Sequence, residues 1–440
     1  MECSSISFRV YKRRYLNLLL LCLNLIITYF QQTIYTSIAN VTAEYYAVSY
    51  TEVNLTSLSW DITAILFYYL CGKFIEIYGL QTSLIVSSFV NALSASIKCI
   101  ALKRNLFWLL LTCQFVCAAL NKLFVLSMSI LAATWFKSSE FALVVGICEA
   151  SIAVGISLTF LFPGLVFASE IRNAIAFRFS LMTIIFAILV AIVYVLTLLL
   201  IKNKPPTPPC LAEQRRSTIE AQPTFTLFKN KNFILLVICI GLADGIFASI
   251  NYTLNQSVLS KFSNGSNVVS IAGVIKSLSS IPGSIIAGVL LKKYAKFKLS
   301  HICYSIFITL SVTLYMLSLE FKSEILLYLS SLSLGLSVIG TMVLIYDYVV
   351  EVTYPYPESV TFGVLFSFMY VPTLLSTPLV TLLIPKFGAV IANTINFVFA
   401  FISVLLSIFV SEDLRRKQAN TKELLLTQRI AHHVSKRNYV

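Results

Sequence analysis

The sequence predicts an all-α membrane protein of about twelve spans, and three observations lead to that class. First, 58% of the 440 residues are hydrophobic and 12% are charged, a balance that a soluble protein of this length cannot bury in its core. Second, the apolar runs are about twenty residues long, the length a helix needs to cross the hydrocarbon layer. Third, these runs lack the strict alternation of barrel strands, and a helix satisfies its backbone groups within one segment.

The apolar runs form two sets of six. The first six expected spans are residues 15–36, 55–75, 81–101, 106–131, 141–167 and 177–201. The second six are residues 230–256, 269–291, 300–320, 325–350, 359–383 and 388–410. Pro372 is one of the prolines expected to kink its span. The hydrophilic segment between the sets holds five of the twelve prolines, so we expect an extended, mobile linker there.

The expected domain organisation follows from this division. The chain has a cytosolic N-terminal tail, an N-terminal six-helix bundle, a cytosolic Pro-rich linker, a C-terminal six-helix bundle and a basic cytosolic tail. Their boundaries are 1–14, 15–201, 202–228, 229–410 and 411–440.

Lysine and arginine are distributed unequally between the two sides of the predicted bundle. With both termini in the cytosol, 23 of the 33 Lys and Arg residues fall on the cytosolic side and 8 on the other, Lys98 among the latter. An excess of basic residues is typical of cytosolic loops. This distribution explains the formal net charge of +14 without nucleic acid, which we do not expect as a partner.

A short loop motif links the two sets. Gly72, Glu76 and Gly79 lie in GKFIEIYG between spans two and three, and Gly288 opens GVLLKKY at the corresponding place in the second set. The correspondence indicates a parallel repeat of two six-helix units. The pattern G-x-x-x-D/E-x-x-G resembles the loop signature of the major facilitator superfamily. The resemblance implies that Glu76 and nearby basic residues hold the halves together on the cytosolic side when the other side is open.

Further segments resemble the feline leukemia virus subgroup C receptor (FLVCR) branch of that superfamily. They are RRYLNLLLLCLN and FQQTIYTSIAN within residues 13–40, NALSASIKC at 91–99, TWFKSSE at 134–140, LNQ at 254–256, EVTYPYPES at 351–359 and DLRR at 413–416. The match runs in order along most of the chain. It implies alternating-access transport by facilitated diffusion, and the family is associated with choline, ethanolamine and haem.

The resemblance fails at the positions expected to hold choline. The family's choline carriers place a tryptophan in span one, a glutamine in span five and a tyrosine in span seven against the ligand. The matching positions here are Gln32, Ala153 and Ala248. Because aromatic faces replace the hydration of a quaternary ammonium, other rings would have to take over. The candidates are Phe30, Tyr35, Phe247, Tyr252, Tyr346 and Tyr348.

Ionisable residues inside spans are costly and therefore indicate function. Spans one, four, seven and ten line the central cavity of the facilitator architecture, so Lys122, Asp244 and Asp347 are expected to meet substrate. The alternative is a buried salt bridge between Lys122 and one of the two aspartates, which would only lock one conformation. Glu351 ends span ten just before a loop, and we expect it to anchor a gate.

Polar uncharged residues in spans one, four and seven complete the expected cavity. They offer hydrogen bonds without a charge, although such amides also join helices to one another. The set, with the nearby aromatic residue of span one, is Gln31, Gln32, Tyr35, Asn121, Asn251, Asn255 and Gln256.

No enzyme motif, cofactor site or metal-ligand spacing is present in the sequence, and two of the three histidines lie in the tail. The leading hypothesis is an FLVCR-like carrier of a small organic metabolite, embedded in the lipid bilayer as a monomer. We expect it in the plasma membrane, with an organelle membrane as the alternative. The functional alternatives are a proton-coupled nutrient transporter and a non-transporting membrane receptor or sensor.

Overall fold

The computed structural model describes residues 11–137, 140–167, 175–205, 224–263, 265–294, 296–354, 356, 358–415 and 417–418. The secondary-structure elements within these residues are all helices, joined by turns and short irregular segments. Eleven helices in the described part are long and apolar enough to cross a membrane. Helix α3 has 51 residues and contains two spans. The expected twelve spans in an all-α fold are therefore confirmed.

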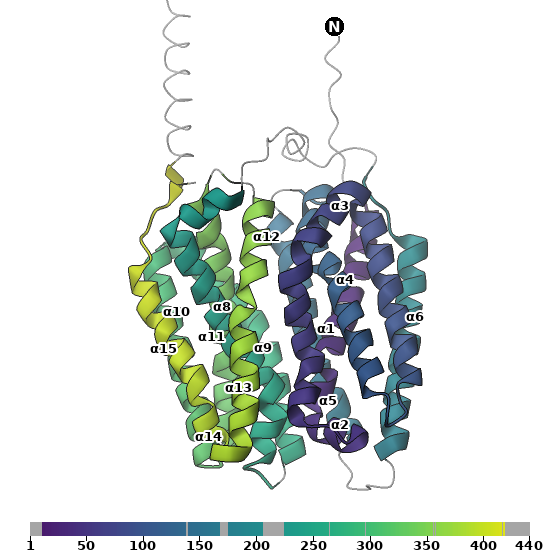
Figure 1. The fold of residues 1–440 in the computed structure, drawn as a ribbon. Coiled ribbons are helices and arrows are strands. Elements are labelled where there is room, and N and C mark those ends of the chain that lie inside the picture. Colours follow the sequence, from purple (N-terminus) through teal and green to yellow (C-terminus); the bar gives the residue numbers. More distant parts are fainter. Residues whose placement is uncertain are drawn as a thin grey trace, which may run out of the picture.

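Two helical bundles stand side by side (Figure 1). The first, called the N-half, contains α1 Arg13–Ser37, α2 Ala39–Tyr46, α3 Tyr50–Ile100, α4 Phe107–Trp135, α5 Phe141–Phe167 and α6 Ile175–Leu200. The second, called the C-half, contains η4 Thr224–Lys229, α8 Lys231–Leu259, α9 Gly265–Tyr294, α10 Phe297–Glu320, α11 Glu324–Thr353, α12 Glu358–Met369, α13 Val371–Phe387, α14 Ala389–Ala392 and α15 Thr394–Phe409. Most of the predicted linker lies outside the described residues.

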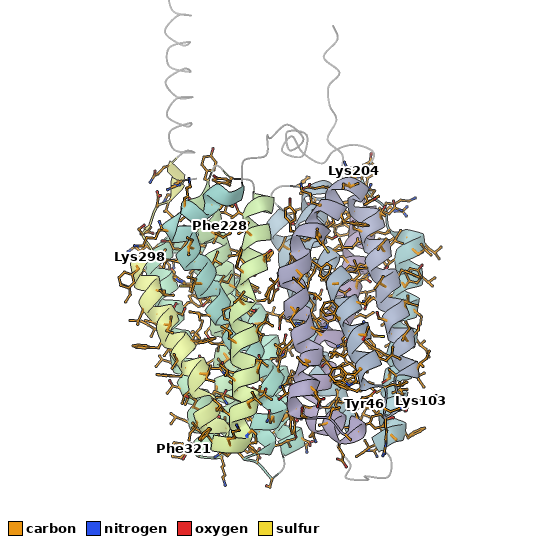
Figure 2. The ribbon with its side chains drawn as sticks, viewed as in Figure 1. Tyr46, Lys103, Lys204, Phe228, Lys298 and Phe321 are labelled. Atoms are coloured by element: carbon orange, nitrogen blue, oxygen red, sulfur yellow. The ribbon has the colours of Figure 1, made fainter. Side chains whose placement is uncertain are left out.

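The two ends of the bundle differ in what they carry. Figure 2 places Lys204, Phe228 and Lys298 at one end, which we call the linker face, and Tyr46, Lys103 and Phe321 at the other, the opposite face. The helices at the start and the end of the chain both reach the linker face (Figure 1). The charge distribution predicts that the linker face is cytosolic.

Gly79 divides α3 into its two spans. Its backbone has φ 77° and ψ 176° inside an otherwise helical segment, a conformation that glycine adopts without steric cost. A Cβ atom at this position would lie 2.8 Å from the Asn203 side chain. Asn203 Oδ1 also accepts the Leu80 amide at 3.0 Å. The loop glycine of the motif is thus required by the turn itself.

The outer surface of the protein is apolar, as a lipid-facing surface must be. Only 17% of the most apolar 18-residue stretch of α6 is buried within the protein. Large side chains of this helix, such as Phe177 and Leu199, are exposed. The interior differs between the halves. One continuous apolar cluster fills the C-half, whereas the N-half has several smaller clusters.

Candidate functional site

The interface between the halves contains a lysine held on aromatic rings. Lys122 of α4 is buried, and its Nζ atom lies 5.5 Å from the ring centroid of Trp60, 5.6 Å from that of Tyr68 and 5.9 Å from that of Tyr370. An ammonium within about 6 Å of a ring centroid is attracted by the negative face of the ring. Trp60 and Tyr68 belong to the N-half and Tyr370 to the C-half, so both halves contribute to this contact.

Helix α3 supplies two of the three rings because of their spacing. Trp60 and Tyr68 are separated by eight residues, about two helical turns, so their side chains lie on one face. Both are almost completely buried. Asp61 follows Trp60 directly and is only 1% exposed. Helix α3 therefore brings two rings and a buried carboxyl group to the interface.

Tyr370 reaches the site through a break in the helix. It separates α12 from α13, and Pro372 occupies the first turn of α13, where a missing amide proton costs no hydrogen bond. The predicted span 359–383 is thus divided into α12 and α13 beside Pro372, one of the prolines at which a kink was expected. The Tyr370 ring stacks on Tyr68 with centroids 6.3 Å apart and planes 7° apart.

Two glycines bring α8 close to this break. Cβ atoms at Gly241 and Gly245 would lie 3.0 Å from Met369 O and from Pro372 Cβ. Because α8 approaches so closely, Asp244 lies beside α13, where its Oδ2 accepts a hydrogen bond of 3.3 Å from Thr373 Oγ1. Small residues that permit close helix contacts are common in membrane proteins.

The three charges at the interface act on one another without forming an ion pair. Lys122 interacts electrostatically with both Asp61 and Asp244. Among the described residues, however, neither carboxylate forms an ion pair with it. The predicted alternative of a Lys122–Asp244 salt bridge is therefore not observed. Asp61 Oδ2 and Trp60 Nε1 are buried and have no hydrogen-bond partner in the described structure.

A hydrogen bond between the halves completes the site. Gln32 Nε2 of α1 donates to Tyr252 Oη of α8 at 2.9 Å, and the Tyr252 hydroxyl also lies next to Asp61. We call these residues the central cluster. Its members are Gln32, Trp60, Asp61, Tyr68, Lys122, Asp244, Tyr252, Tyr370 and Thr373.

A second group of contacts joins the halves at the opposite face, and we call it the opposite-face lock. Asn255 Nδ2 of α8 donates to Ser37 O at 3.1 Å and to Asn40 Oδ1 at 3.0 Å, and Asn255 Oδ1 accepts from Asn40 N at 3.1 Å. Asn54 Nδ2 donates to Thr381 Oγ1 at 2.7 Å. The lock consists of Ser37, Asn40, Asn54, Asn255 and Thr381.

Other predicted cavity residues lie elsewhere. Gln256 Nε2 donates to Thr381 O at 3.2 Å inside the C-half. Asn251 is buried, with Oδ1 unpartnered in the described part. Tyr35 packs against Phe179 in the N-half, with ring centroids 6.3 Å apart. Asp347 is exposed in the last turns of α11.

Gln31 and Asn121 belong to a polar network inside the N-half. Gln31 donates to Asn91 and accepts from Lys98 Nζ at 2.7 Å. Asn121 accepts from Ser87 Oγ at 3.3 Å. Lys98 is 3% exposed and lies in the last turn of α3, within the expected span 81–101. Its long side chain turns into the bundle, where amide oxygens replace the hydration of the ammonium.

The loop motif makes contacts within the N-half. Glu76 Oε2 pairs with Lys73 Nζ of the same helix at 2.7 Å, and both side chains are exposed. A Cβ at Gly72 would meet no atom within 4 Å. The family resemblance implies that Glu76 contacts the other half when the opposite side is open. In this structure the hydrogen bonds of the opposite-face lock join the halves on that side.

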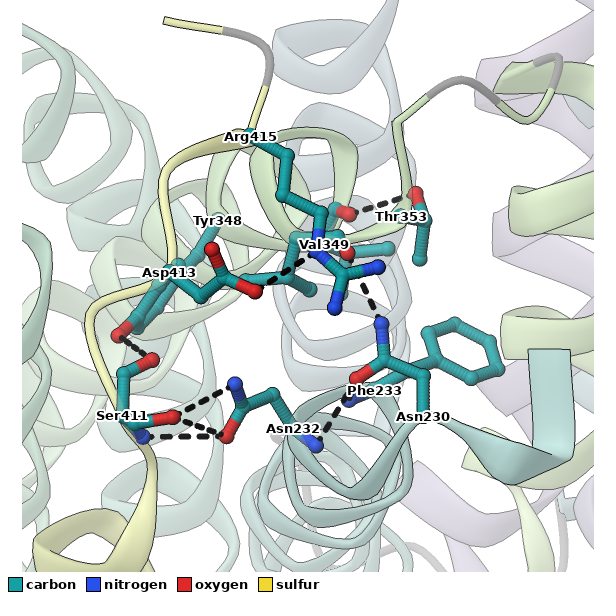
Figure 3. A network of polar contacts seen from close by, with 10 residues as sticks. Asn230, Asn232, Phe233, Tyr348, Val349, Thr353, Ser411, Asp413 and Arg415 are labelled. Carbon is teal, nitrogen blue, oxygen red and sulfur yellow. Dashed lines mark hydrogen bonds and ion pairs between the residues drawn. The ribbon is translucent and has the colours of Figure 1, made fainter. Parts of the chain in front are cut away.

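Glu351 contacts the tail. Its Oε2 accepts a hydrogen bond of 3.0 Å from the Lys417 amide. Figure 3 shows the adjoining network, in which Asn232 of α8 bonds the backbone and side chain of Ser411 and Tyr348 Oη donates to Ser411 O at 3.1 Å. These bonds fasten the start of the tail to α8 and α11 of one half.

Ala153 and Ala248 stand at the positions where the resemblance implies choline-binding residues. Ala248 forms one apolar cluster with Leu58 and Tyr252, so a ring lies near the position where the resemblance implies an aromatic residue. Ala153 lines a crevice of about 50 Å³ together with Glu149 and Phe247. No group of His, Cys, Asp and Glu residues in the described ranges could hold a metal ion.

Sequence reasoning missed three rings of the central cluster. Trp60, Tyr68 and Tyr370 lie in spans two and eleven, outside the four spans expected to line the cavity. Asp61 is the signal that could have found them, since an aspartate next to a tryptophan inside an apolar span has to be stabilised by neighbouring helices.

Comparison with known proteins identifies the family that shares this architecture. The model of the Major Facilitator Superfamily matches residues 21–377. The choline/ethanolamine transporter flvcr2a of Danio rerio is 29% identical over 429 residues, which cover 96% of this chain and 91% of the relative. The choline/ethanolamine transporter FLVCR2 of Rattus norvegicus is 28% identical and FLVCR1 of Felis catus 25% identical, covering 94% and 93% of this chain and 77% and 74% of the relatives. The expected FLVCR resemblance is confirmed.

Solved structures show the same fold. A bacterial homologue of the human lysosomal transporter Spinster, in an inward-facing and occupied conformation, superimposes with a TM-score of 0.69 at 12% identity. The match covers 92% of this chain and 98% of the other. Its unoccupied form gives a TM-score of 0.68. Because the family model spans most of the sequence and the fold agrees, this chain belongs to the Major Facilitator Superfamily and is a transmembrane transporter rather than an enzyme.

Proposed function

We propose that this transporter carries small organic cations of the choline and ethanolamine class by alternating access, as facilitated diffusion. The observation that carries the proposal is the position of Lys122 Nζ over three rings contributed by both halves. A site that holds an ammonium on aromatic faces has the chemistry that organic ammonium ions require. The printed names of the relatives, choline/ethanolamine transporters, point to the same class.

The charges of the central cluster support a cationic substrate. With Asp61 and Asp244 ionised and Lys122 protonated, the three groups carry a formal charge of −1. Charge inside a membrane protein is costly unless it is balanced. One monovalent cation balances this site, whereas an anion would increase the imbalance.

The arrangement of contacts supports alternating access. The opposite-face lock closes one end of the interface with hydrogen bonds between neutral groups. Such bonds are individually modest, about 1 kcal/mol each, so they can break and re-form during each cycle. Because one chain supplies every member of the central cluster, the proposal includes a working monomer.

Uptake by purified protein in liposomes tests the proposal. We expect saturable uptake of labelled choline and ethanolamine, and no change in uptake when a protonophore collapses an imposed pH gradient. Haem serves as the alternative cargo, since the sequence also suggested it. Absence of flux for both ammonium compounds would contradict the proposal, and loss of uptake with the pH gradient would favour the proton-coupled alternative.

A further inference from the structure

The central cluster keeps its cation and its acceptors apart. In a weakly polar interior, a carboxylate is a strong hydrogen-bonding partner for an ammonium. Asp61 and Asp244 both act electrostatically on Lys122, yet Lys122 lies on rings and makes no ion pair with a described carboxylate. Asp61 Oδ2, which is buried, has no hydrogen-bond partner in the described part of the chain.

The ring contact depends on the closed interface. Tyr68 and Tyr370 stack across it, and Tyr68 also stacks on Phe366 of α12 with ring centroids 5.4 Å apart. Lys122 reaches these rings on a flexible stem of four carbons, so its ammonium can move without a change of the helix. The rings are therefore fixed by packing, whereas the cation on them is free to leave.

We propose that the Lys122 ammonium is a resident cation, which means that it occupies the three rings when no substrate is bound. When a substrate binds, the substrate ammonium replaces that of Lys122 on the rings, and Lys122 moves to pair with Asp61. The substrate class in this inference rests on the proposed function. With both aspartates ionised and Lys122 protonated, the three groups carry a formal charge of −1 before the exchange, and the added substrate makes the sum zero after it. The exchange gives Asp61 Oδ2, which has no hydrogen-bond partner among the described residues, a charged partner.

This exchange also determines which ammonium ions are preferred. A primary ammonium is chemically similar to that of Lys122 and gains little by replacing it on the rings. A quaternary ammonium has no N–H groups to hydrate and gains most from aromatic faces. The site should therefore favour choline over ethanolamine, and Lys122 would set this preference without contacting the substrate hydroxyl.

Lys122→Met removes the resident cation with little change in side-chain length. Binding is measured through the thermal stability of the purified protein, with tetramethylammonium chloride titrated against sodium chloride at equal ionic strength. We expect apparent binding of tetramethylammonium about tenfold tighter than in the wild type. Lys122→Arg keeps the charge and should bind like the wild type.

Lys276→Met is the matched control. Lys276 is also buried and also lies over a ring, with Nζ 4.4 Å from the Phe247 centroid. It donates to Phe247 O at 3.3 Å and is not part of the central cluster. Its replacement should leave tetramethylammonium binding unchanged. Lys122→Gln provides a second neutral variant in case the methionine variant does not fold.

The outcomes separate this inference from the proposed function. Tighter tetramethylammonium binding in the neutral Lys122 variants supports the exchange. It does so even if the wild type fails to transport choline, a result that would overturn only the proposed function. Choline transport by the wild type with unchanged or weaker tetramethylammonium binding in both neutral variants would overturn the exchange alone. No stabilisation of the wild type or either neutral variant by tetramethylammonium would also overturn it.

Discussion

The central cluster and the opposite-face lock join the same two halves with different chemistry. The lock uses amides, hydroxyls and backbone groups, and Asn255 alone takes part in three hydrogen bonds. The central cluster uses charges and rings, and it leaves Asp61 Oδ2 and Trp60 Nε1 without partners among the described groups. A gate needs bonds that are complete when closed, whereas a binding site needs groups that remain available to a ligand.

The largest expected effect comes from removing a charge at the central cluster. Asp244→Asn keeps the shape and the contact with Thr373 but changes the formal charge of the site from −1 to 0. We expect kcat/KM for choline uptake in liposomes to fall roughly 10- to 100-fold, because an interaction with a charged group contributes about 1.5–3 kcal/mol. Glu320→Gln, at an exposed position at the end of α10, is the control. Equal uptake by Asp244→Asn and the wild type would exclude Asp244 from the site.

Breaking the lock should change the conformational balance more than the binding. Asn255→Ala removes three hydrogen bonds and leaves their partners in Ser37 and Asn40 unsatisfied. We expect the closed opposite face to lose about 1–3 kcal/mol. Spin labels at Lys103 and Phe321, which lie at that face in different halves (Figure 2), should report longer distances.

A second label pair distinguishes opening from unfolding. Labels at Lys204 and Lys298, at the linker face (Figure 2), should move closer together in Asn255→Ala if the halves rock. Longer distances at both faces would indicate that the halves separate instead. An unchanged distance between Lys103 and Phe321 would show that Asn255 does not hold this face closed.

The ring of Tyr370 provides a smaller test of the central cluster. Tyr370→Phe keeps the aromatic face, and we expect choline uptake within about twofold of the wild type, since the ring attraction does not need the hydroxyl. Tyr370→Ala removes the face and should raise KM about fivefold, in line with a cation–ring contact of about 1 kcal/mol. Similar losses in both variants would assign the role of Tyr370 to its hydroxyl group.

The smallest effect is expected at the tail contact. Glu351→Gln keeps an acceptor for the Lys417 amide, and the contact lies within one half, so it does not oppose movement between the halves. We expect choline uptake to change less than about twofold, as an exposed interaction of this kind contributes little. A large loss of uptake would instead support the gate that the sequence suggested for Glu351.

The sequence predicted the spans well because hydropathy is a local property. The expected span 141–167 coincides with α5, and span 300–320 differs from α10 by three residues at one end. The division at Gly79 also follows from a local requirement, since only a glycine accommodates that backbone and the neighbouring Asn203 side chain. The candidate site was predicted only in part, with Gln32, Lys122, Asp244 and the candidate ring Tyr252 in the central cluster.

What the sequence by itself determined is therefore the membrane class, the two bundles and the presence of charges that need partners. The tertiary structure alone decided the direction of each side chain. Gln31 and Gln32 are adjacent in α1, yet one turns into the N-half and the other reaches Tyr252 of the C-half. Trp60, Tyr68 and Tyr370 meet around Lys122 because helix rotation and the break before Pro372 bring them together. Helix packing across the interface fixes that rotation, and the hydropathy of a single sequence does not predict it.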